Sequence, residues 1–210
     1  MYPITNQLVT FGILPMRLLV VDDHNPTRQE IVRELSTGGV IEVVGESETS
    51  DMALKAAKEL LPDVILLDLH LPGLIGTVDL IKRMTALRNV RVVMFASQGK
   101  PSEVQDLLDA GAVGYVLKTD PPALIRMALL MVMRGSKGVV SPSLPRHITR
   151  LSQDERSVLR SITMRGKLAK AAERLEISEA DLMELVEGLM AKLELEKPEQ
   201  LVKWAKKHGF

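Results

Sequence analysis

The segment 63-DVILLDLHLPG-73 joins an unbroken apolar run to an aspartate, Asp68, and then to a proline-glycine pair. A short run of Val, Ile and Leu without alternation is typical of a strand that is buried on both faces of a parallel sheet. The Pro-Gly pair favours a loop. The segment therefore predicts a central parallel strand that ends at a carboxylate and is followed by a loop.

Similar strand patterns, each followed by a helical pattern, lie on both sides of this segment. They place the other strands at 18–21, 41–45, 90–95 and 115–117. Asn25 and Pro26 form a typical helix start after the first strand. Five strand–helix units in succession predict an α/β fold with a five-stranded, doubly wound parallel sheet of the flavodoxin-like type.

Composition along the chain divides it into four parts. The first fifteen residues lack the basic start and long apolar core of a signal peptide, and Met16 directly precedes the first expected strand. We therefore expect residues 1–16 to be an N-terminal extension, and an incorrectly chosen upstream start codon is the alternative. Residues 17–134 carry the α/β pattern, and residues 135–150 are rich in Gly, Pro and Ser, as a linker is. Residues 151–210 have no strand pattern and predict a small all-α domain of four helices.

The overall composition narrows the classes of function. The 27 Lys and Arg balance the 27 Asp and Glu, so the charge neither requires nor excludes a nucleic acid partner. The absence of Cys excludes disulfides and thiolate metal sites. No apolar run reaches the roughly 18 residues of a membrane span. This composition fits a protein of the reducing cytoplasm with no membrane partner.

Charged residues follow three of the expected strands: Asp22 and Asp23 the first, Asp68 the third and Lys118 the fifth. Because the carboxyl ends of parallel strands form one edge of a sheet, we expect these side chains to converge. Three carboxylates repel one another unless a cation joins them, and oxygen ligands of this kind suit Mg²⁺. A carboxylate can also act as a nucleophile, while a lysine can contact a phosphoryl oxygen. The alternative is that each aspartate only solvates the end of a strand.

Three segments resemble the signature segments of receiver domains: 20-VVDDH-24, the segment 63–73 and 111-GAVGYVLK-118. This resemblance covers residues 17–134. In that family the domain accepts a phosphoryl group from a sensor histidine kinase. The resemblance therefore implies a phosphorelay regulator and not an enzyme.

The resemblance also implies roles for individual residues. Asp68 would be the phosphoacceptor and Lys118 would contact the phosphoryl group. Asp22 and Asp23 would organise Mg²⁺ together with Asp68, and the backbone carbonyl of His70 would be a further metal ligand. An aspartate-nucleophile phosphatase is the weaker alternative, because position 70 is His where such an enzyme has a second acid.

The switch region departs from the family pattern. Receivers carry Thr or Ser at the end of the fourth strand, where the hydroxyl contacts the phosphoryl group, but here that place falls on Ala96. Ser97 is next to it, and it either substitutes or is simply a polar loop residue. Tyr115 matches the aromatic whose rotamer often reports activation in the family; the alternative is a half-buried strand aromatic. The resemblance thus implies phosphorylation with an altered switch.

The expected fifth helix, 121–134, is apolar nearly all round, although a helix that covers one face of a sheet needs only an apolar stripe. The excess predicts a second contact, either a homodimer surface or the C-terminal domain. Burial beneath the linker is the alternative.

The C-terminal segments 151-LSQDERSVLR-160, 172-AERLEISEA-180 and 201-LVKWAKKHG-209 resemble the LuxR-type helix-turn-helix domain. Together with a receiver, this pairing is identified as a NarL/FixJ-type response regulator. It implies a dimeric transcriptional regulator that binds DNA.

The third helix of that domain, 179–193, departs from the family at the face that would enter DNA. This face carries Asp181, Met183, Glu184 and Glu187, whereas the family usually has Lys in place of Met183. DNA affinity rests largely on Lys and Arg that neutralise phosphates, and residues 146–210 hold 13 basic and 11 acidic residues. Both DNA binding and regulation through protein contacts therefore stay open. The candidate DNA-contacting residues are Lys167, Lys170, Arg174, Met183, Glu184, Glu187 and Lys192.

Overall fold

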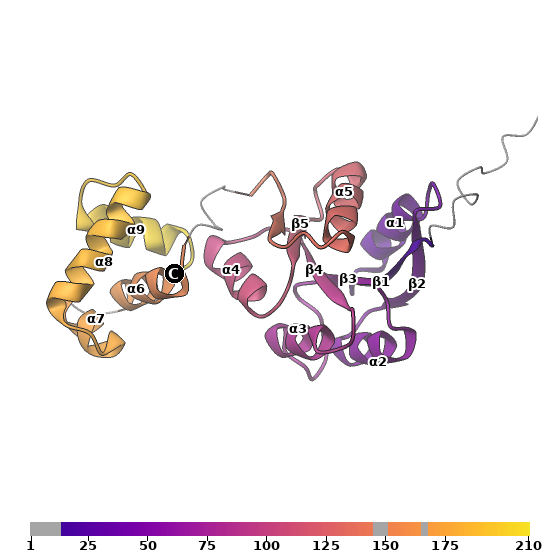
Figure 1. Ribbon diagram of the computed structural model, residues 1–210, viewed down its shortest axis with the longest axis horizontal. Coiled ribbons are helices and arrows are strands. Elements are labelled where there is room, and N and C mark those ends of the chain that lie inside the picture. Colours follow the sequence, from indigo (N-terminus) through magenta and orange to yellow (C-terminus); the bar gives the residue numbers. More distant parts are fainter. Residues whose placement is uncertain (1–13, 145–150, 165–167) are drawn as a thin grey trace, which may run out of the picture. The chain divides into compact units, whose positions relative to one another are not determined.

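The structure is a computed structural model that describes residues 14–144, 151–164 and 168–210 (Figure 1). The chain divides into two compact units, which are described separately below. The first contains the residues up to Gln98 together with Leu107–Ser143, and the second contains Gly99–Asp106 together with Leu144–Phe210. None of the helices in the described ranges combines the length and the apolar character that crossing a bilayer requires.

A parallel sheet forms the centre of the first unit. In the described part of the chain it has six strands in the order β2-β1-β3-β4-β5-β6. The direction in which strands are added reverses between β1 and β3, and the carboxyl ends of two such strands form the usual ligand-binding crevice of a doubly wound sheet. The predicted sheet type is confirmed. The strands are β1 Met16–Val21, β2 Ile41–Ser47, β3 Val64–Asp68, β4 Arg91–Ala96, β5 Gly114–Leu117 and β6 Val139–Val140.

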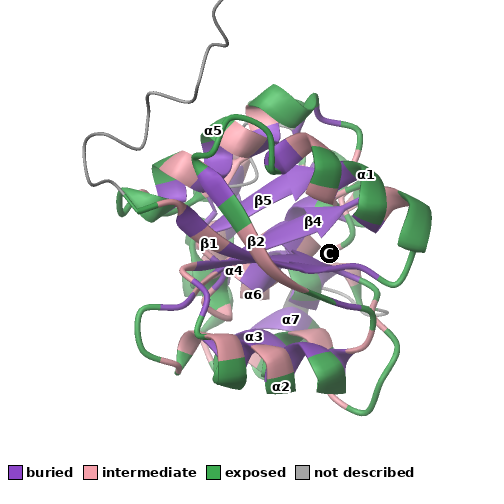
Figure 2. Ribbon diagram, turned by 90° about the vertical axis from the view of Figure 1, so that its right-hand side faces the viewer, coloured by how far each residue is buried: buried purple, intermediate pink, exposed green. Residues whose placement is uncertain are grey.

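Helices cover both faces of this sheet, with α1 and α5 on one side and α2 and α3 on the other (Figure 2). Side chains alternate between the faces of a strand, so burial on both faces explains the unbroken apolar runs of the sequence. On the side of α1 and α5, Leu18, Leu66 and Phe95 pack against Leu35 and Leu129. Each such side chain contributes about 1.5–3 kcal/mol when it is fully buried. The helices of this unit are α1 Asn25–Leu35, α2 Ser50–Leu60, α3 Thr77–Thr85 and α5 Pro122–Met133, while most of α4 Pro101–Asp109 belongs to the second unit.

The sixth strand was not predicted, because β6 lies inside the expected linker 135–150. Val139 pairs with Gly114 and Val140 with Tyr115 in parallel register. This approach depends on Gly114, since a Cβ atom there would lie only 2.9 Å from the carbonyl oxygen of Val139. A strand of two residues is too short to show a periodic pattern in the sequence.

The second unit contains the four predicted helices within its described residues. Val158 and Leu159 of the first of them pack with Leu182, Val186 and Leu189 in one apolar core. The predicted inward stripe of the third helix is therefore confirmed. The helices are α6 Gln153–Thr163, α7 Leu168–Leu175, α8 Glu179–Lys192 and α9 Pro198–Lys207.

Candidate functional site

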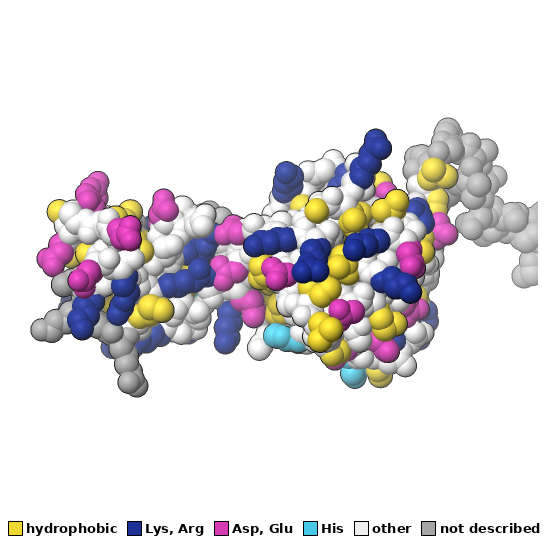
Figure 3. Space-filling view, turned by 90° about the horizontal axis from the view of Figure 1, so that it is seen from below, with side chains coloured by type: hydrophobic (Ala, Val, Ile, Leu, Met, Phe, Trp, Pro, Cys, Tyr) yellow, Lys and Arg dark blue, Asp and Glu magenta, His cyan; other side chains and the backbone are white. Residues whose placement is uncertain are grey.

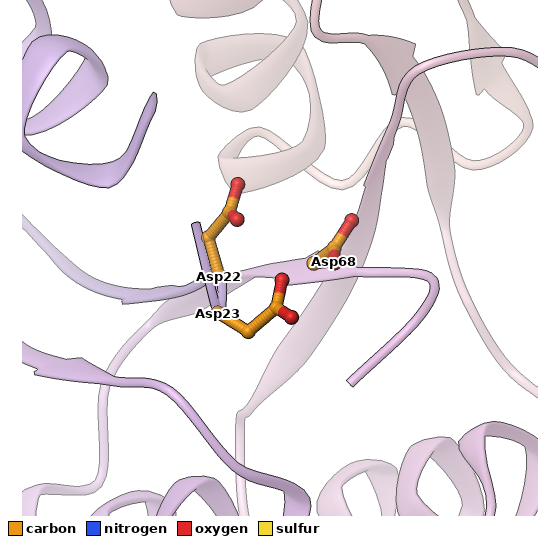
Figure 4. Close-up of side chains that lie close together, drawn as sticks. All are labelled: Asp22, Asp23 and Asp68. Carbon is orange, nitrogen blue, oxygen red and sulfur yellow. The ribbon is translucent and has the colours of Figure 1, made fainter. Parts of the chain in front are cut away.

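The carboxyl ends of β1 and β3 bring three aspartates together. Asp22 and Asp23 directly follow β1, and Asp68 is the last residue of β3. Each of the three offers one carboxylate oxygen that lies within 4.8 Å of those of the other two (Figure 4). Asp22 is 0% and Asp68 5% exposed, whereas Asp23 faces solvent. The site is therefore a partly buried acidic pocket that is open on one side.

Lys118, directly after β5, bridges the two buried carboxylates. Its Nζ lies 2.8 Å from Oδ2 of Asp22 and 3.0 Å from Oδ1 of Asp68. Its backbone amide donates to the carbonyl of Ala96 at 2.8 Å, which ties the end of β5 to the end of β4. The ammonium also lies 5.5 Å from the centre of the Phe95 ring. Residues from four strand ends thus share one small volume.

Burial and charge shift the pKa values of Asp68 and Lys118 in the metal-free protein. Burial raises the pKa of the Asp68 carboxyl, and the hydrogen bond and positive charge of Lys118 offset only part of the rise. Burial alone would lower the pKa of Lys118, but its hydrogen bonds to Asp22 and Asp68 outweigh burial and raise that pKa. Lys118 therefore stays protonated, while the ionised form of Asp68 is held at a cost.

The donor set fits a divalent cation. The carboxylates of Asp22, Asp23 and Asp68 face the single ammonium of Lys118, so these four side chains carry excess negative charge when they are ionised. The donors at this edge are oxygens, which is the ligand type that Mg²⁺ prefers, and the open side leaves room for the waters that it keeps. The residues that would hold Mg²⁺ are Asp22, Asp23 and Asp68.

Arg28 supports the acidic pair, and sequence reasoning missed it. Its guanidinium donates to the backbone carbonyl of Asp22 and forms an ion pair with Glu46 at 3.1 Å, while its exposed fraction is only 9%. The backbone amide of His24 donates to Oδ1 of Asp22 at 2.9 Å. The sequence shows only a basic residue in the first turns of an amphipathic helix. Because such residues are mostly exposed to solvent, this pattern does not identify Arg28 as part of the site.

The loop after Asp68 is held by the start of α2. The amide of Leu74 donates to Asp51 Oδ2 at 2.8 Å, and the amide of Ile75 donates to Ser50 Oγ at 3.2 Å. Gly73 has φ +133°, and a Cβ atom there would overlap Ser50 Oγ. His70 is exposed in this loop. Its carbonyl stays a predicted metal ligand.

The predicted switch positions lie at the end of β4 and on β5. Ala96 is the last residue of β4 and is 1% exposed, while Ser97 faces solvent. Tyr115 is fully buried, and its hydroxyl donates to the carbonyl of Gln98 at 2.7 Å. The aromatic is thus more deeply buried than a half-exposed strand residue, and it holds the loop that follows β4.

Part of the apolar surplus on α5 reaches the surface of the first unit. Met127, Met131 and Met133 are 53%, 43% and 36% exposed. A cavity of about 550 Å³ lies between α5 and the segment 136–142. The segment therefore covers the helix only in part, and a homodimer contact through α5 stays a prediction.

In the second unit, the described candidate residues on α7 and α8 differ in their surroundings. Met183, Glu184 and Glu187 are exposed on α8, as expected from the pattern. Asp181, by contrast, accepts a hydrogen bond from Ser178 Oγ at 2.7 Å at the start of the helix. Acidic groups at a helix N-terminus are favourable, which gives Asp181 a local structural role.

Two of the basic candidate DNA-contacting residues form contacts with other residues of this unit. Lys192 forms an ion pair with Glu155 at 2.8 Å, and Arg174 donates to the carbonyl of Ser161 at 3.1 Å. Burial opposes ionisation of Glu155, but the hydrogen bonds from Lys192 and from the Ser152 amide lower its pKa. Lys170 is exposed, and Lys167 lies outside the described residues. Figure 3 shows both acidic and basic side chains on the visible surface of this unit.

Comparisons with known sequences agree with this geometry. The sequence profile of the response regulator receiver domain matches residues 18–129. The response regulator protein VraR of Staphylococcus saprophyticus is 30% identical over 207 residues, which cover 94% of this chain and 99% of VraR. The nitrate/nitrite response regulator protein NarL of Escherichia coli K12 is 28% identical over 204 residues, which cover 90% of this chain and 94% of NarL.

Solved structures give the same assignment. The signal receiver domain of NarL from Mycobacterium tuberculosis matches 59% of this chain and 99% of its own, with a TM-score of 0.56 and 33% identity. A chain from a structure of two RcsB dimers bound to two parallel DNAs matches 91% of this chain and 98% of its own, with a TM-score of 0.58 and 25% identity. The chain therefore belongs to the response regulators, a family of non-enzymatic signalling proteins, and combines a receiver domain with a helical C-terminal domain of the kind found in NarL, VraR and RcsB.

Proposed function

We propose that this protein receives a phosphoryl group on Asp68 from a sensor histidine kinase, in a reaction that depends on Mg²⁺. The observation that carries the proposal is the meeting of Asp22, Asp23, Asp68 and Lys118 at one edge of the sheet of a response regulator. An aspartate that only solvates a strand end would have no reason to be buried beside another buried carboxylate.

In the proposed step, a carboxylate oxygen of Asp68 attacks the phosphorus of a phosphohistidine. The new O–P bond gives an acyl phosphate, and the N–P bond breaks. The imidazole nitrogen keeps the electron pair and takes a proton from solvent. Lys118, 3.0 Å from Asp68, is placed to contact a phosphoryl oxygen. Mg²⁺, held by Asp22, Asp23 and Asp68, supplies neutralisation of the charge on the phosphoryl oxygens.

Incubation with acetyl phosphate should phosphorylate the wild-type chain only when Mg²⁺ is present. The reason is that the acidic pocket repels an anionic donor unless a cation offsets its charge. Intact-protein mass spectrometry with and without EDTA measures the transfer, and hydroxylamine should remove the label because it cleaves acyl phosphates. A label that forms equally well in EDTA, or that resists hydroxylamine, would contradict the proposal.

Ala96→Thr should enlarge the conformational response to phosphorylation. The added hydroxyl would lie at the end of β4, where it can donate to a phosphoryl oxygen on Asp68. Ala96 is buried, so the extra atoms should cost about 1–3 kcal/mol of stability. The measurement is the change in sedimentation coefficient on phosphorylation, with Ser97→Ala as the control. If phosphorylation changes the sedimentation coefficient equally in wild type and in Ala96→Thr, the missing hydroxyl at position 96 does not weaken the conformational response.

For the output, we propose DNA-binding transcriptional regulation by a homodimer. The structure of RcsB dimers on DNA concerns a relative with a similar chain, and it supports this proposal by analogy. The exposed methionines of α5, Met127 and Met131, are the dimer contact that we propose. The candidate DNA contacts are the basic residues of the second unit and the outer face of α8.

A second candidate output is regulation through protein contacts by a helix-turn-helix scaffold that binds DNA weakly or not at all. The observation that favours it is the exposure of Glu184 and Glu187 beside Met183 on α8. Exposed carboxylates on this face oppose the approach of DNA phosphates. Mobility-shift measurements over a range of salt concentrations distinguish the two outputs.

A further inference from the structure

Asp120 is a third buried carboxylate of the first unit, and it lies outside the acidic pocket. It is 6% exposed. Its Oδ2 accepts from the amide of Leu117 at 2.8 Å, and its Oδ1 accepts from Ser141 Oγ at 2.8 Å and Ser143 Oγ at 3.3 Å. We call Asp120, Ser141 and Ser143 the Asp120 clasp. Its hydrogen-bond donors come from two segments, the end of β5 and the residues after β6.

One side of the clasp closes the turn that carries Lys118. The amide of Asp120 donates to the carbonyl of Leu117 at 3.0 Å, and its carboxylate receives the amide of the same residue. Lys118 and Thr119 lie between these two residues. The backbone of Lys118 is also bound to the carbonyl of Ala96. Asp120 thus fixes the backbone from which the Lys118 ammonium reaches Asp68.

The other side of the clasp holds β6 to the sheet. The amide of Val139 donates to Val113 at 3.1 Å, and the amide of Ser141 donates to Tyr115 at 2.8 Å. Ser141 is 2% exposed, and the amide of Ser143 donates to its Oγ at 3.1 Å. In the sequence, Ser143 is the last residue of the first unit. The clasp therefore binds residues 141–143, which form the C-terminal end of the first unit.

A buried carboxylate is a costly way to attach a short edge strand. Apolar residues would hold it without desolvating a charge, and buried polar networks are favourable only when each member is satisfied. Both carboxylate oxygens of Asp120 accept hydrogen bonds. Oδ2 accepts from the turn that carries Lys118, and Oδ1 accepts from the segment after β6. Sharing one side chain between the two segments means that displacement of either segment alters the hydrogen bonds of the other.

We propose that Asp120 is a positioning residue that couples the placement of Lys118 in the phosphorylation site to the docking of residues 139–143 on β5. The inference rests on the proposed function. When Lys118 shifts to contact a phosphoryl group on Asp68, its turn moves, the hydrogen bonds of Ser141 and Ser143 to Asp120 weaken, and β6 loosens. This coupling needs no hydroxyl at position 96, where this chain has Ala96.

The test opens the clasp from the side that is remote from Lys118. In the full chain, Ser141→Ala with Ser143→Ala removes two donors and keeps Asp120 in place. Hydrogen-deuterium exchange of the peptide 136–143, which contains the backbone amides of positions 139 and 141, should become roughly tenfold faster. The maximal rate of phosphorylation by acetyl phosphate should fall several-fold, because Lys118 is less well placed.

Two further variants separate coupling from a general loss of stability. Ser136→Ala lies in the same segment but outside the clasp, so it should match wild type in exchange and in rate. Ser141→Thr with Ser143 intact keeps the hydroxyl and should retain most of the wild-type rate. In wild type, phosphorylation should itself speed exchange of the peptide 136–143, and in the double variant it should add little, because the clasp is already open.

The outcomes are distinguishable. Absence of Mg²⁺-dependent phosphorylation in wild type would overturn the proposed function itself. If wild type is phosphorylated but the double variant keeps the wild-type rate, the coupling is overturned, whether or not exchange of 136–143 has increased. Unchanged exchange of that peptide on phosphorylation of wild type would overturn it as well.

Discussion

Replacing Asp68 with asparagine should abolish phosphorylation without lowering the stability of the metal-free protein. An amide oxygen is too weak a nucleophile to form the acyl phosphate. The stability follows from burial, which raises the pKa of Asp68 and so makes its ionised form costly at neutral pH. Asparagine has nearly the same shape without the charge, and Lys118 keeps its ion pair with Asp22.

The sign of the pH dependence checks this argument. A carboxyl whose pKa is higher in the folded protein than in the unfolded chain binds its proton more tightly when folded, so its contribution to stability improves as the pH falls through the raised pKa. In EDTA, the advantage of Asp68→Asn over wild type should therefore be largest at neutral pH and should shrink toward acid. Urea unfolding at several pH values measures the difference.

Asp63→Asn is the matched control for Asp68→Asn. It makes the same change just before the opposite end of β3, where Asp63 accepts a hydrogen bond from the amide of Arg17 at 2.9 Å. This variant should be phosphorylated at the wild-type rate. A label that persists in Asp68→Asn would place the phosphoacceptor elsewhere. If Asp68→Asn lowers the free energy of unfolding by more than about 2 kcal/mol, the desolvation argument is contradicted.

The parts of the fold that the sequence predicted are those set by local pattern. The unbroken run Val64–Leu67 had to be a strand buried on both faces, and the structure places it next to β1 at the centre of the sheet. The meeting of Asp22 and Asp68 followed from topology alone, because carboxyl ends of neighbouring parallel strands share an edge. Neither inference needed the details of side-chain packing.

What the sequence could not predict depends on contacts between distant segments. Strand β6 forms because Gly114 leaves space for the carbonyl of Val139, 25 positions later. Asp120, directly before a proline, has the sequence pattern of an ordinary helix start, and its bonds to Ser141 exist only in the folded unit. Arg28 likewise has the pattern of a solvated helix residue until its approach to Asp22 is known. Each of these is a tertiary contact with no periodic signal.

Helix α8 of the second unit combines an apolar packing stripe with an outer face that carries acidic residues. The inward residues of α8 pack as any such helix must, since apolar burial stabilises the unit whatever it binds. The outer residues do not need to be apolar for the unit to fold. Their chemistry therefore indicates what kind of partner α8 contacts. Met183 is 41% exposed there, with Glu187 one turn further along the helix.

Under the second candidate output, regulation through protein contacts, the unmodified full chain should bind duplex DNA weakly near physiological salt, and Met183→Lys with Glu187→Ser should strengthen that binding about tenfold or more. The lysine adds one phosphate contact, and each neutralised phosphate contributes about −0.9 to the slope of log affinity against log salt. The serine removes a carboxylate that repels phosphates. Fluorescence anisotropy over a range of salt concentrations measures both the affinity and the slope.

Met164→Lys is the matched control, because it makes the same change at another exposed methionine of the second unit, outside α8. It should change the affinity and the slope less than the α8 variant does. A different outcome follows if Glu184 and Glu187 accept hydrogen bonds from cytosine amino groups, since the α8 changes would then weaken binding to one particular sequence. Selection from random duplexes decides between these cases. Recovery of one tight motif by the unmodified chain would contradict weak binding and favour an ordinary transcription factor, whereas recovery of none would leave protein contacts as the output of this regulator.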